Sequence, residues 1–168
     1  MPEFVMLRRS ALIWLTASAV VIAIDQITKA FVIAHLEPYV PREVIPGFFN
    51  WTLAFNTGAA FSFLADQPGW QRWLFTALAM CITIALTIWL KRTPRNDWKT
   101  ALPVSLVIGG ALGNLIDRIH AGTVTDFIQV YYRDWIFPSF NVADSAISVG
   151  AALLVIFGRF ASSKPASR

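Results

Sequence analysis

Two aspartates in the second half of the chain have the type and setting needed for acid–base chemistry. Asp126 lies in a polar segment, and Asp144 stands just before the apolar run 146–157. Two carboxyl groups held close together cannot easily both ionise, so they share one proton. The ionised group can then activate water while the protonated group polarises a peptide carbonyl. The spacing permits such a pair if the intervening chain folds back.

Asp144 also has a purely structural interpretation. Asn141 is a favoured helix N-cap residue, and an acidic residue three positions later approximates a capping box. The negative charge would also interact favourably with the positive end of the helix dipole. The local pattern alone favours capping, and it leaves catalysis open.

Further polar residues interrupt the apolar segments. Asp25 and Lys29 are spaced i, i+4, so they share a helix face and can form a structural ion pair. Asn114, Asp117 and Arg118 cluster near the end of another apolar run, where Asp117 and Arg118 can also be ordinary interfacial residues. Charges inside a membrane are costly and normally face the bundle interior. Their convergence at one depth indicates a polar site near one membrane boundary.

Other kinds of chemistry have less support. Neither of the two histidines stands in a zinc-ligand spacing, and the single cysteine, Cys81, lies in an apolar run. We therefore expect no metal and no cofactor. A Ser–Lys peptidase with Ser62 and Lys29 is conceivable, but Asp25 one turn away would keep the lysine charged. A small proton- or ion-coupled membrane transporter also stays open, because intramembrane charges mark ion pathways.

The elements that must position these groups are membrane helices. The 168-residue chain is 56% hydrophobic and only 14% charged, with a mean hydropathy of +0.56, which is too apolar for an ordinary soluble domain. A span needs about 20 mostly apolar residues. Within a single expected domain (1–168), four segments qualify: 11–34, 70–90, 100–119 and 139–158. We expect a mainly α membrane protein that contacts membrane lipid and no nucleic acid.

The lysines and arginines predict the orientation. Nine of the 14 precede the first span, join the second span to the third, or follow the fourth. Four spans place all of these on one side, which should be cytoplasmic. Both termini are then inside the cell, and the segments 35–69 and 120–138 are extracytoplasmic. The polar groups lie near the outer face.

The first outer segment contains a strand pattern. In the stretch NWTLAFN (50–56), centred on Leu53, apolar and polar residues alternate, which predicts a half-buried β-strand. We expect its apolar face to lie on the membrane surface and Asn56 to face the site. The aromatic residues that follow suit an interfacial helix or loop. The segment 44–70 is expected to form a small β-strand cradle and a lid, with Gly58 as its hinge.

Five stretches of the chain, in this order, resemble those of the bacterial lipoprotein signal peptidases (signal peptidase II), which are membrane aspartic peptidases. They are DQITK (25–29), NTGAAFSFL (56–64), GGALGNLIDR (109–118), VTDF (124–127) and FPSFNVADSAISVGA (137–151). The resemblance covers nearly the whole chain apart from its tails and the loop around Arg95. One such motif is weak evidence, whereas five in register are highly specific.

The resemblance implies roles for individual residues. Asp126 and Asp144 would form the catalytic dyad. The residues that would line or support the site are Asn56, Gly110, Asn114, Arg118, Asn141, Asp25 and Lys29. The residues alone indicate that Gly109 and Gly113, a GxxxG pair, pack against another helix, and that Gly110 beside them leaves room for a ligand's backbone.

The resemblance also implies the reaction. The family removes signal peptides from diacylglyceryl-modified prolipoproteins and cleaves just before the lipidated cysteine. It needs no metal, and globomycin-type cyclic peptides inhibit it. The expected location is the bacterial cytoplasmic (inner) membrane, with the active site near its periplasmic face.

Overall fold

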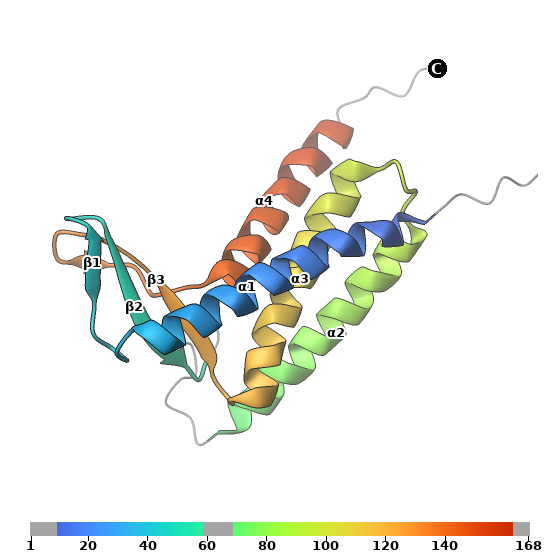
Figure 1. Cartoon of the computed structure of the whole chain (residues 1–168). Coiled ribbons are helices and arrows are strands. Elements are labelled where there is room, and N and C mark those ends of the chain that lie inside the picture. The colour runs from blue at the N-terminus through green and yellow to red at the C-terminus, as the bar shows by residue number, and fades with distance from the viewer. Residues whose placement is uncertain (1–9, 59–68, 163–168) are drawn as a thin grey trace, which may run out of the picture.

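The computed structural model describes residues 10–58 and 69–162, with side chains as far as Gly158. This part of the chain folds into a helix bundle with a small antiparallel sheet at one end (Figure 1). A 3-10 turn at Ala11–Trp14 leads into α1 (Leu15–His35), and the other helices are α2 (Trp70–Arg92), α3 (Trp98–His120) and α4 (Val142–Ser162). Both described chain ends lie at the end of the bundle away from the sheet.

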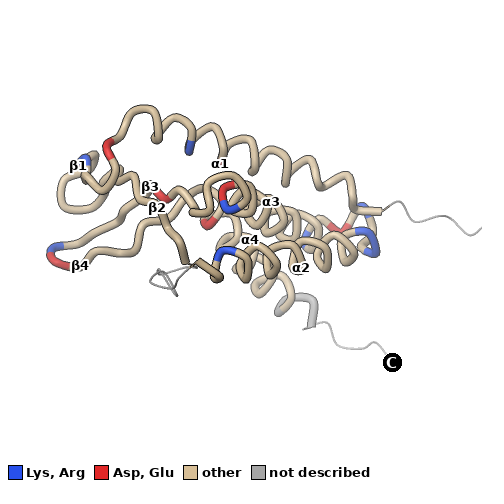
Figure 2. Tube along the Cα trace, turned by 90° about the horizontal axis from the view of Figure 1, so that it is seen from below, with Lys and Arg blue, Asp and Glu red and all other residues tan. Residues whose placement is uncertain are grey.

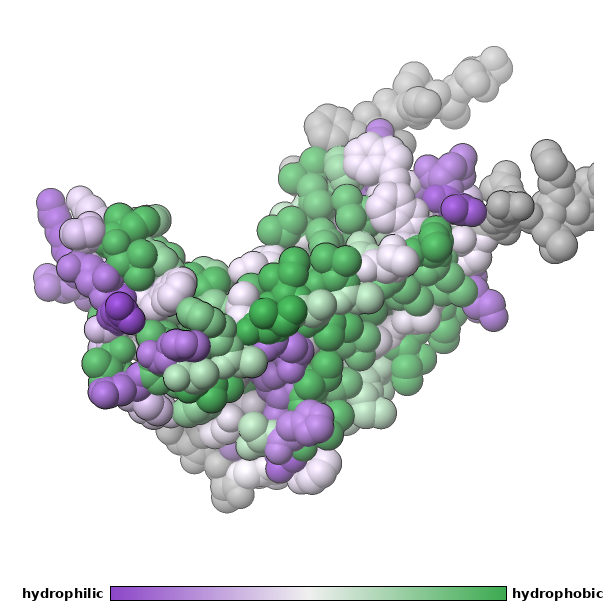
Figure 3. All heavy atoms as spheres, in the orientation of Figure 1, coloured by the Kyte–Doolittle hydropathy of each residue, from purple (hydrophilic) through white to green (hydrophobic). Residues whose placement is uncertain are grey.

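Helix α3 is the centre of the bundle. It contacts α1, α2 and α4, and it has many more buried residues than α1 or α2. On the face seen in Figure 3, apolar residues cover much of the helices, whereas hydrophilic residues gather over the sheet, at the lower end of the bundle beside it, and at the far end of the bundle. Among the described residues, three helices are long and apolar enough to cross a membrane, and α4 adds a shorter apolar segment, Val142–Gly158. The protein is therefore membrane-embedded, as predicted.

Glycines allow α3 to lie close to its neighbours. A Cβ atom on Gly109 would lie 2.9 Å from a backbone carbonyl oxygen of α1, and one on Gly113 would lie 2.7 Å from a carboxylate oxygen of Asp25. The prediction that Gly109 and Gly113 serve helix packing is confirmed. A Cβ on Gly110 would lie 2.3 Å from the carbonyl oxygen of Ala143. The expectation that Gly110 leaves room for a ligand's backbone is wrong, because α4 takes that space.

The sheet has the strand order β1-β2-β3-β4, and all its strand pairs are antiparallel. The strands are β1 (Arg42–Ile45), β2 (Phe49–Asn56), β3 (Val124–Tyr132) and β4 (Trp135–Ile136). Strand β2 confirms the strand predicted at 50–56. Strand β3 was not predicted, although its β-branched and aromatic residues favour such a strand.

The apolar residues of β2 do not all face the membrane. Leu53 is only 1% exposed and packs with Val32 of α1 and Phe127 of β3. The pairing of β2 with β3 shifts register between Trp51 and Ala54. Buried and exposed side chains therefore do not alternate along β2, although apolar and polar residues alternate in its sequence. The expected membrane-facing position of Leu53 is therefore wrong, and this side chain anchors the sheet to α1.

Helix α4 begins three residues later than predicted, at Val142 instead of 139. The reason is that Phe140 pairs with β3: its N–H donates to the carbonyl of Ile128, and its own carbonyl accepts from the N–H of Ile128. The ends of α2 and α3 lie within two residues of the predicted ones, and the predicted span 11–34 corresponds to the 3-10 turn together with α1.

The predicted lid falls mostly on residues 59–68, which lie outside the described residues, as does Ser62. Gly58, the predicted hinge, is described and buried. Its N–H donates to the side-chain oxygen of Asn56 at 2.9 Å. The lid and its hinge stay predictions.

We predict that Gly110→Ala lowers the thermal stability of the purified protein by several degrees. The added methyl group must push α4 away from α3, and overpacking of this kind costs about 1–3 kcal/mol. Gly158→Ala is the matched control, because a Cβ there meets nothing within 4 Å and alanine favours a helix over glycine. Equal melting temperatures for the two variants in detergent would contradict this assignment.

Candidate active site

A cavity of about 680 Å³ opens between α2, α3, α4 and the connections of the sheet. Its charged and amide residues, which come from β2, α3, β3 and α4, are Asn56, Asn114, Arg118, Asp126 and Asp144, and three serines also line it, Ser139, Ser145 and Ser148. Most of the remaining lining is apolar and includes Phe75, Leu78, Ile82, Val107 and Ile147. The cavity therefore has one polar region within a mainly apolar wall.

Asn141 connects the two carboxyl groups. Its side-chain Nδ2 donates to Oδ1 of Asp126 at 2.7 Å, and its backbone N–H donates to Oδ2 of Asp144 at 3.3 Å. The backbone N–H of Asp144 donates in return to Oδ1 of Asn141 at 2.8 Å. This reciprocal pair is the predicted capping box, which is thus confirmed. The same residue that starts α4 also holds the carboxyl group on β3.

Two further amides complete the hydrogen bonding of the carboxyl groups. Asn56 donates through Nδ2 to Oδ2 of Asp126 at 3.2 Å, and Asn114 donates through Nδ2 to Oδ1 of Asp144 at 2.7 Å. Both oxygens of each carboxyl group therefore accept a hydrogen bond, as buried acceptors require. Sequence analysis predicted these asparagines as site residues, and the structure brings both of them to the carboxyl pair.

The environment of Asp126 favours its protonated form. Burial is the main cause, and the neighbouring charge of Asp144 acts in the same direction; together they raise the pKa of Asp126 to about 7, although the hydrogen bonds from Asn56 and Asn141 and the charge of Lys29 oppose the shift. Asp126 is thus able to carry a proton near neutral pH. This property suits a general acid.

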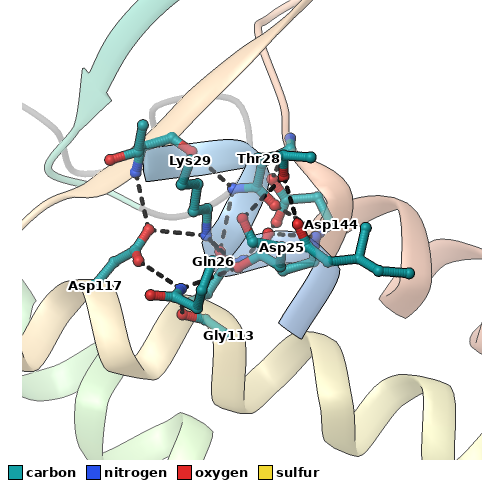
Figure 4. Close-up of polar contacts among 12 residues, drawn as sticks. Asp25, Gln26, Thr28, Lys29, Gly113, Asp117 and Asp144 are labelled. Carbon is teal, nitrogen blue, oxygen red and sulfur yellow. Dashed lines mark hydrogen bonds and ion pairs between the residues drawn. The ribbon is translucent and has the colours of Figure 1, made fainter. Parts of the chain in front are cut away.

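A buried group of three charged side chains, Asp25, Lys29 and Asp117, joins α1 to α3 (Figure 4). Nζ of Lys29 lies 2.7 Å from Oδ2 of Asp25 and 2.8 Å from Oδ2 of Asp117. All three side chains are buried, so Asp117 is not the exposed interfacial residue that one interpretation of the sequence allowed. The predicted Asp25–Lys29 ion pair is confirmed, and Asp117 extends it to α3.

The ion triad Asp25–Lys29–Asp117 also binds the elements that carry the carboxyl pair. Oδ1 of Asp25 accepts from the backbone N–H of Ala143 at 2.9 Å, in the first turn of α4. Oδ2 of Asp117 accepts from the backbone N–H of Thr125 at 3.1 Å, next to Asp126 on β3. These contacts fix both elements relative to α1 and α3.

Two supporting residues, Gln26 and Arg72, were not predicted from the sequence. Gln26 donates through Nε2 to Asp117, Asp25 and the carbonyl of Gly113. Arg72 of α2 donates to the carbonyls of Arg118 and Ile119, where it caps the end of α3. A glutamine inside an apolar span was an available signal, because polar groups there normally face the interior. Arg72 lies at a helix end, where an arginine gives no such signal.

Arg118 lines the cavity beside the carboxyl pair. Its guanidinium donates to the carbonyls of Gly58 at 3.1 Å and Asn114 at 3.4 Å, and it lies 5.5 Å from the ring centre of Phe75. A guanidinium has five N–H donors, so this group has further capacity to bind oxygen atoms of a ligand in the cavity.

The structure thus brings together most of the predicted site residues. Five of them line the cavity, Asn141 joins the two carboxyl groups, and Asp25 and Lys29 support the site from behind. Gly110 is the exception, because it serves the contact with α4. Among the described residues, no group of three or more His, Cys, Asp or Glu side chains is placed to hold a metal ion.

A carboxyl pair sharing an asparagine, beside a mainly apolar cavity in a membrane helix bundle, defines a membrane-embedded hydrolase of the aspartic type. Comparison with known proteins agrees with this class. The family model for signal peptidase (SPase) II matches residues 17–160. The chain belongs to the signal peptidase II family, which is a family of aspartic peptidases.

Individual relatives extend this comparison. The chain is 58% identical to a lipoprotein signal peptidase of Xanthomonas campestris pv. campestris over 151 residues, which is 90% of each chain. It is 56% identical to one of Xylella fastidiosa, covering 88% of this chain and 90% of the relative. A solved bacterial membrane enzyme, 31% identical, superposes with a TM-score of 0.79 over 92% of this chain and 93% of that one.

We predict that Asn141→Ser and Asn141→Ala both lose most peptidase activity but differ in stability. Serine is a good N-cap residue, so it preserves the start of α4, whereas alanine costs about 1 kcal/mol there. Neither side chain can reproduce the 2.7 Å contact with Asp126. Activity assays and thermal unfolding in detergent measure the two effects separately. Full activity in the serine variant would show that Asn141 acts only as a cap.

Proposed function

We propose that this protein removes signal peptides from diacylglyceryl-modified prolipoproteins, with Asp126 and Asp144 as its catalytic dyad. The observation that carries the proposal is that Asn141 holds both carboxyl groups at the polar region of a mainly apolar cavity. The relatives from Xanthomonas and Xylella are both named lipoprotein signal peptidases. Their names supply the substrate class.

The two carboxyl groups have different roles in this mechanism. The carboxylate of Asp144 accepts a proton from water, and the resulting hydroxide attacks the scissile carbonyl carbon. Asp126 donates its proton to the carbonyl oxygen, giving a neutral tetrahedral intermediate. When the C–N bond breaks, Asp144 passes its proton to the leaving amine of the cysteine, and the intermediate's hydroxyl proton returns to Asp126. The pair is then ready for another cycle.

The shape and lining of the cavity fit such a substrate. The diacylglyceryl chains and the signal helix are apolar, and they would contact apolar residues such as Leu78, Ile82 and Ile147. Burial of apolar surface contributes about 25 cal/mol per Å². The scissile peptide would then lie at the polar region, with Arg118 available to bind one of its carbonyl oxygens. Globomycin-type cyclic peptides and membrane lipid are proposed to occupy the same cavity.

The distribution of charge supports a location in the bacterial cytoplasmic membrane with both termini inside. Charged residues gather near the sheet and at the opposite end of the bundle (Figure 2). Lys91, Arg92, Arg95 and Lys99 join α2 to α3 at that opposite end, where the described chain ends also lie. By the positive-inside rule this end is cytoplasmic, so the carboxyl pair would lie near the periplasmic face.

A Ser–Lys peptidase and an ion-coupled transporter have less support. A Ser–Lys peptidase needs a neutral lysine, but the three N–H groups of Lys29 have three acceptors within 3.0 Å, on Asp25, Asp117 and Asn114. An ion-coupled transporter needs charges along a path across the membrane. The family and the clustering of buried charges at one level of the bundle favour the peptidase.

We predict that Asp126→Asn and Asp144→Asn each reduce cleavage of a diacylglyceryl-modified prolipoprotein at least a hundredfold, because general acid–base catalysis contributes about 10²–10⁴-fold. Asparagine has nearly the same shape as aspartate, so the melting temperature should change little. Ser62→Ala is the control and should remain active. Normal cleavage by Asp144→Asn would disprove the dyad.

The pH dependence gives a second prediction. The reaction needs the proton of Asp126, whose pKa is about 7, so kcat/KM should fall about tenfold per pH unit well above pH 7. At low pH it should fall again as the pair takes up a second proton. The two transitions belong to the coupled pair. A rate that stays constant well above pH 7 would contradict the assignment of Asp126 as general acid.

A further inference from the structure

The side-chain amides around the carboxyl pair are each held in one orientation. In every case the amide oxygen accepts from a group that can only donate. The pairs are Asn114 with Lys29 Nζ at 3.0 Å, Asn141 with the backbone N–H of Asp144 at 2.8 Å, and Asn56 with the backbone N–H of Gly58 at 2.9 Å. A flipped amide would turn its NH₂ group toward that donor and lose the bond. The NH₂ groups are thus directed at the carboxyl oxygens.

Lys29 differs from the other two holding groups. They are backbone N–H groups, whose positions follow from the chain itself, whereas Lys29 is a side chain of α1 that does not line the cavity. Two of its N–H groups are directed to Asp25 and Asp117, at 2.7 and 2.8 Å. The third is directed to Oδ1 of Asn114 at 3.0 Å, and the same oxygen also accepts from Nδ2 of Asn141 at 3.1 Å. The ion triad therefore orients the ammonium group as well as neutralising it.

Through Asn114, Lys29 acts on one carboxyl group more than on the other. Nδ2 of Asn114 donates to Asp144 at 2.7 Å, whereas Asp126 receives its amide hydrogen bonds from Asn56 and Asn141. If Asn114 were free to flip, its oxygen would face Asp144 and would favour the protonated acid there.

We propose that Lys29 is a positioning residue that, together with Nδ2 of Asn141, locks the amide of Asn114 with its NH₂ toward Asp144, so that Asp144 is the ionised member of the pair and Asp126 keeps the shared proton. This inference rests on the proposed catalytic dyad, and it adds a group that secures the roles of its two members. It gives α1, which contributes nothing to the cavity lining, a part in determining which carboxyl group is ionised.

The charges around the pair determine how the proposal has to be tested. The charged side chains facing it are Asp25 and Lys29 of α1, Asp117 and Arg118 of α3, Asp126 of β3 and Asp144 of α4. In the described part of the chain, α2 and β2 contribute no charged side chain to the cavity lining. Removing Lys29 alone would leave two unpaired buried carboxylates, and breaking such a group costs about 3–5 kcal/mol.

A charge-balanced variant reduces this problem from two unpaired buried carboxylates to one. Asp25, Lys29 and Asp117 carry a net charge of −1, and Lys29→Met combined with Asp117→Asn leaves Asp25 alone with the same net charge. Asp117→Asn by itself is the matched control, because it retains the contact between Lys29 and Asn114. Both proteins are to be compared with the unchanged chain after thermal unfolding has shown that they are folded.

The experiment is a pH titration of the protein labelled with ¹³C at the aspartate carboxyl carbons, with signals assigned by Asp126→Asn and Asp144→Asn. We expect the acidic transition of the pair to move about one unit toward higher pH in the balanced variant, and to stay in place in Asp117→Asn. In a protein that already carries Asn114→Ala, adding Lys29→Met and Asp117→Asn should not move the acidic transition any further. Equal movement in both backgrounds, or none in either, would overturn the proposal.

This readout does not depend on catalysis. If the proposed dyad is wrong, Asp126→Asn or Asp144→Asn remains active, whatever the titration shows. If only the role of Lys29 is wrong, both aspartate variants are inactive and the titration fails to respond to Lys29 through Asn114. The kinetic counterpart is a loss of kcat of about tenfold in the balanced variant with little change in KM, because the substrate cavity is untouched.

Discussion

The neutralisation of one buried lysine is the constraint on which the rest of the site depends. Lys29 lies inside the bundle, where an unpaired charge is very costly, and two carboxylates surround it. That leaves one excess negative charge. Backbone N–H groups of Ala143 and Thr125 stabilise it, and these belong to α4 and β3. The two elements that carry the carboxyl pair are thus held by the same charges that neutralise the lysine.

Close helix packing makes this arrangement possible. Gly113 leaves the space that the carboxylate of Asp25 occupies between α1 and α3, and Gly110 lets α4 approach α3. Helices α1 and α4, which carry Asp25, Lys29 and Asp144, therefore lie in direct contact with α3. Among the described residues, the buried side-chain atoms without a hydrogen-bond partner are hydroxyl groups of Thr76, Thr83 and Ser105, none of which belongs to the site. The polar network is complete, as a buried network must be.

The sequence predicted the elements and residues whose signals are local. Long apolar runs predicted the helices, and i, i+4 and i, i+3 spacings predicted the Asp25–Lys29 pair and the capping box at Asn141. Strand β3 was missed, because its residues are buried near Asp126 and do not alternate. The role predicted for Gly110 was wrong, because a glycine that makes room for a neighbouring helix and a glycine that makes room for a ligand give the same signal in a sequence. The hydrogen bonds that Asp25 and Asp117 accept from backbone N–H groups could not be predicted, because every non-proline residue has such a group.

The two carboxyl groups are inequivalent because one lies on a strand and the other on a helix. Asp144 lies in the first turn of a helix, where the helix dipole and a backbone N–H favour a negative charge. Asp126 lies on a buried strand, where desolvation and its charged neighbour favour the proton. No conformational change or bound substrate is needed to distinguish them. In the proposed mechanism, the fold thus distinguishes acid from base before the substrate arrives, and the hydrogen bond from Asn114 reinforces an asymmetry that already exists in the backbone.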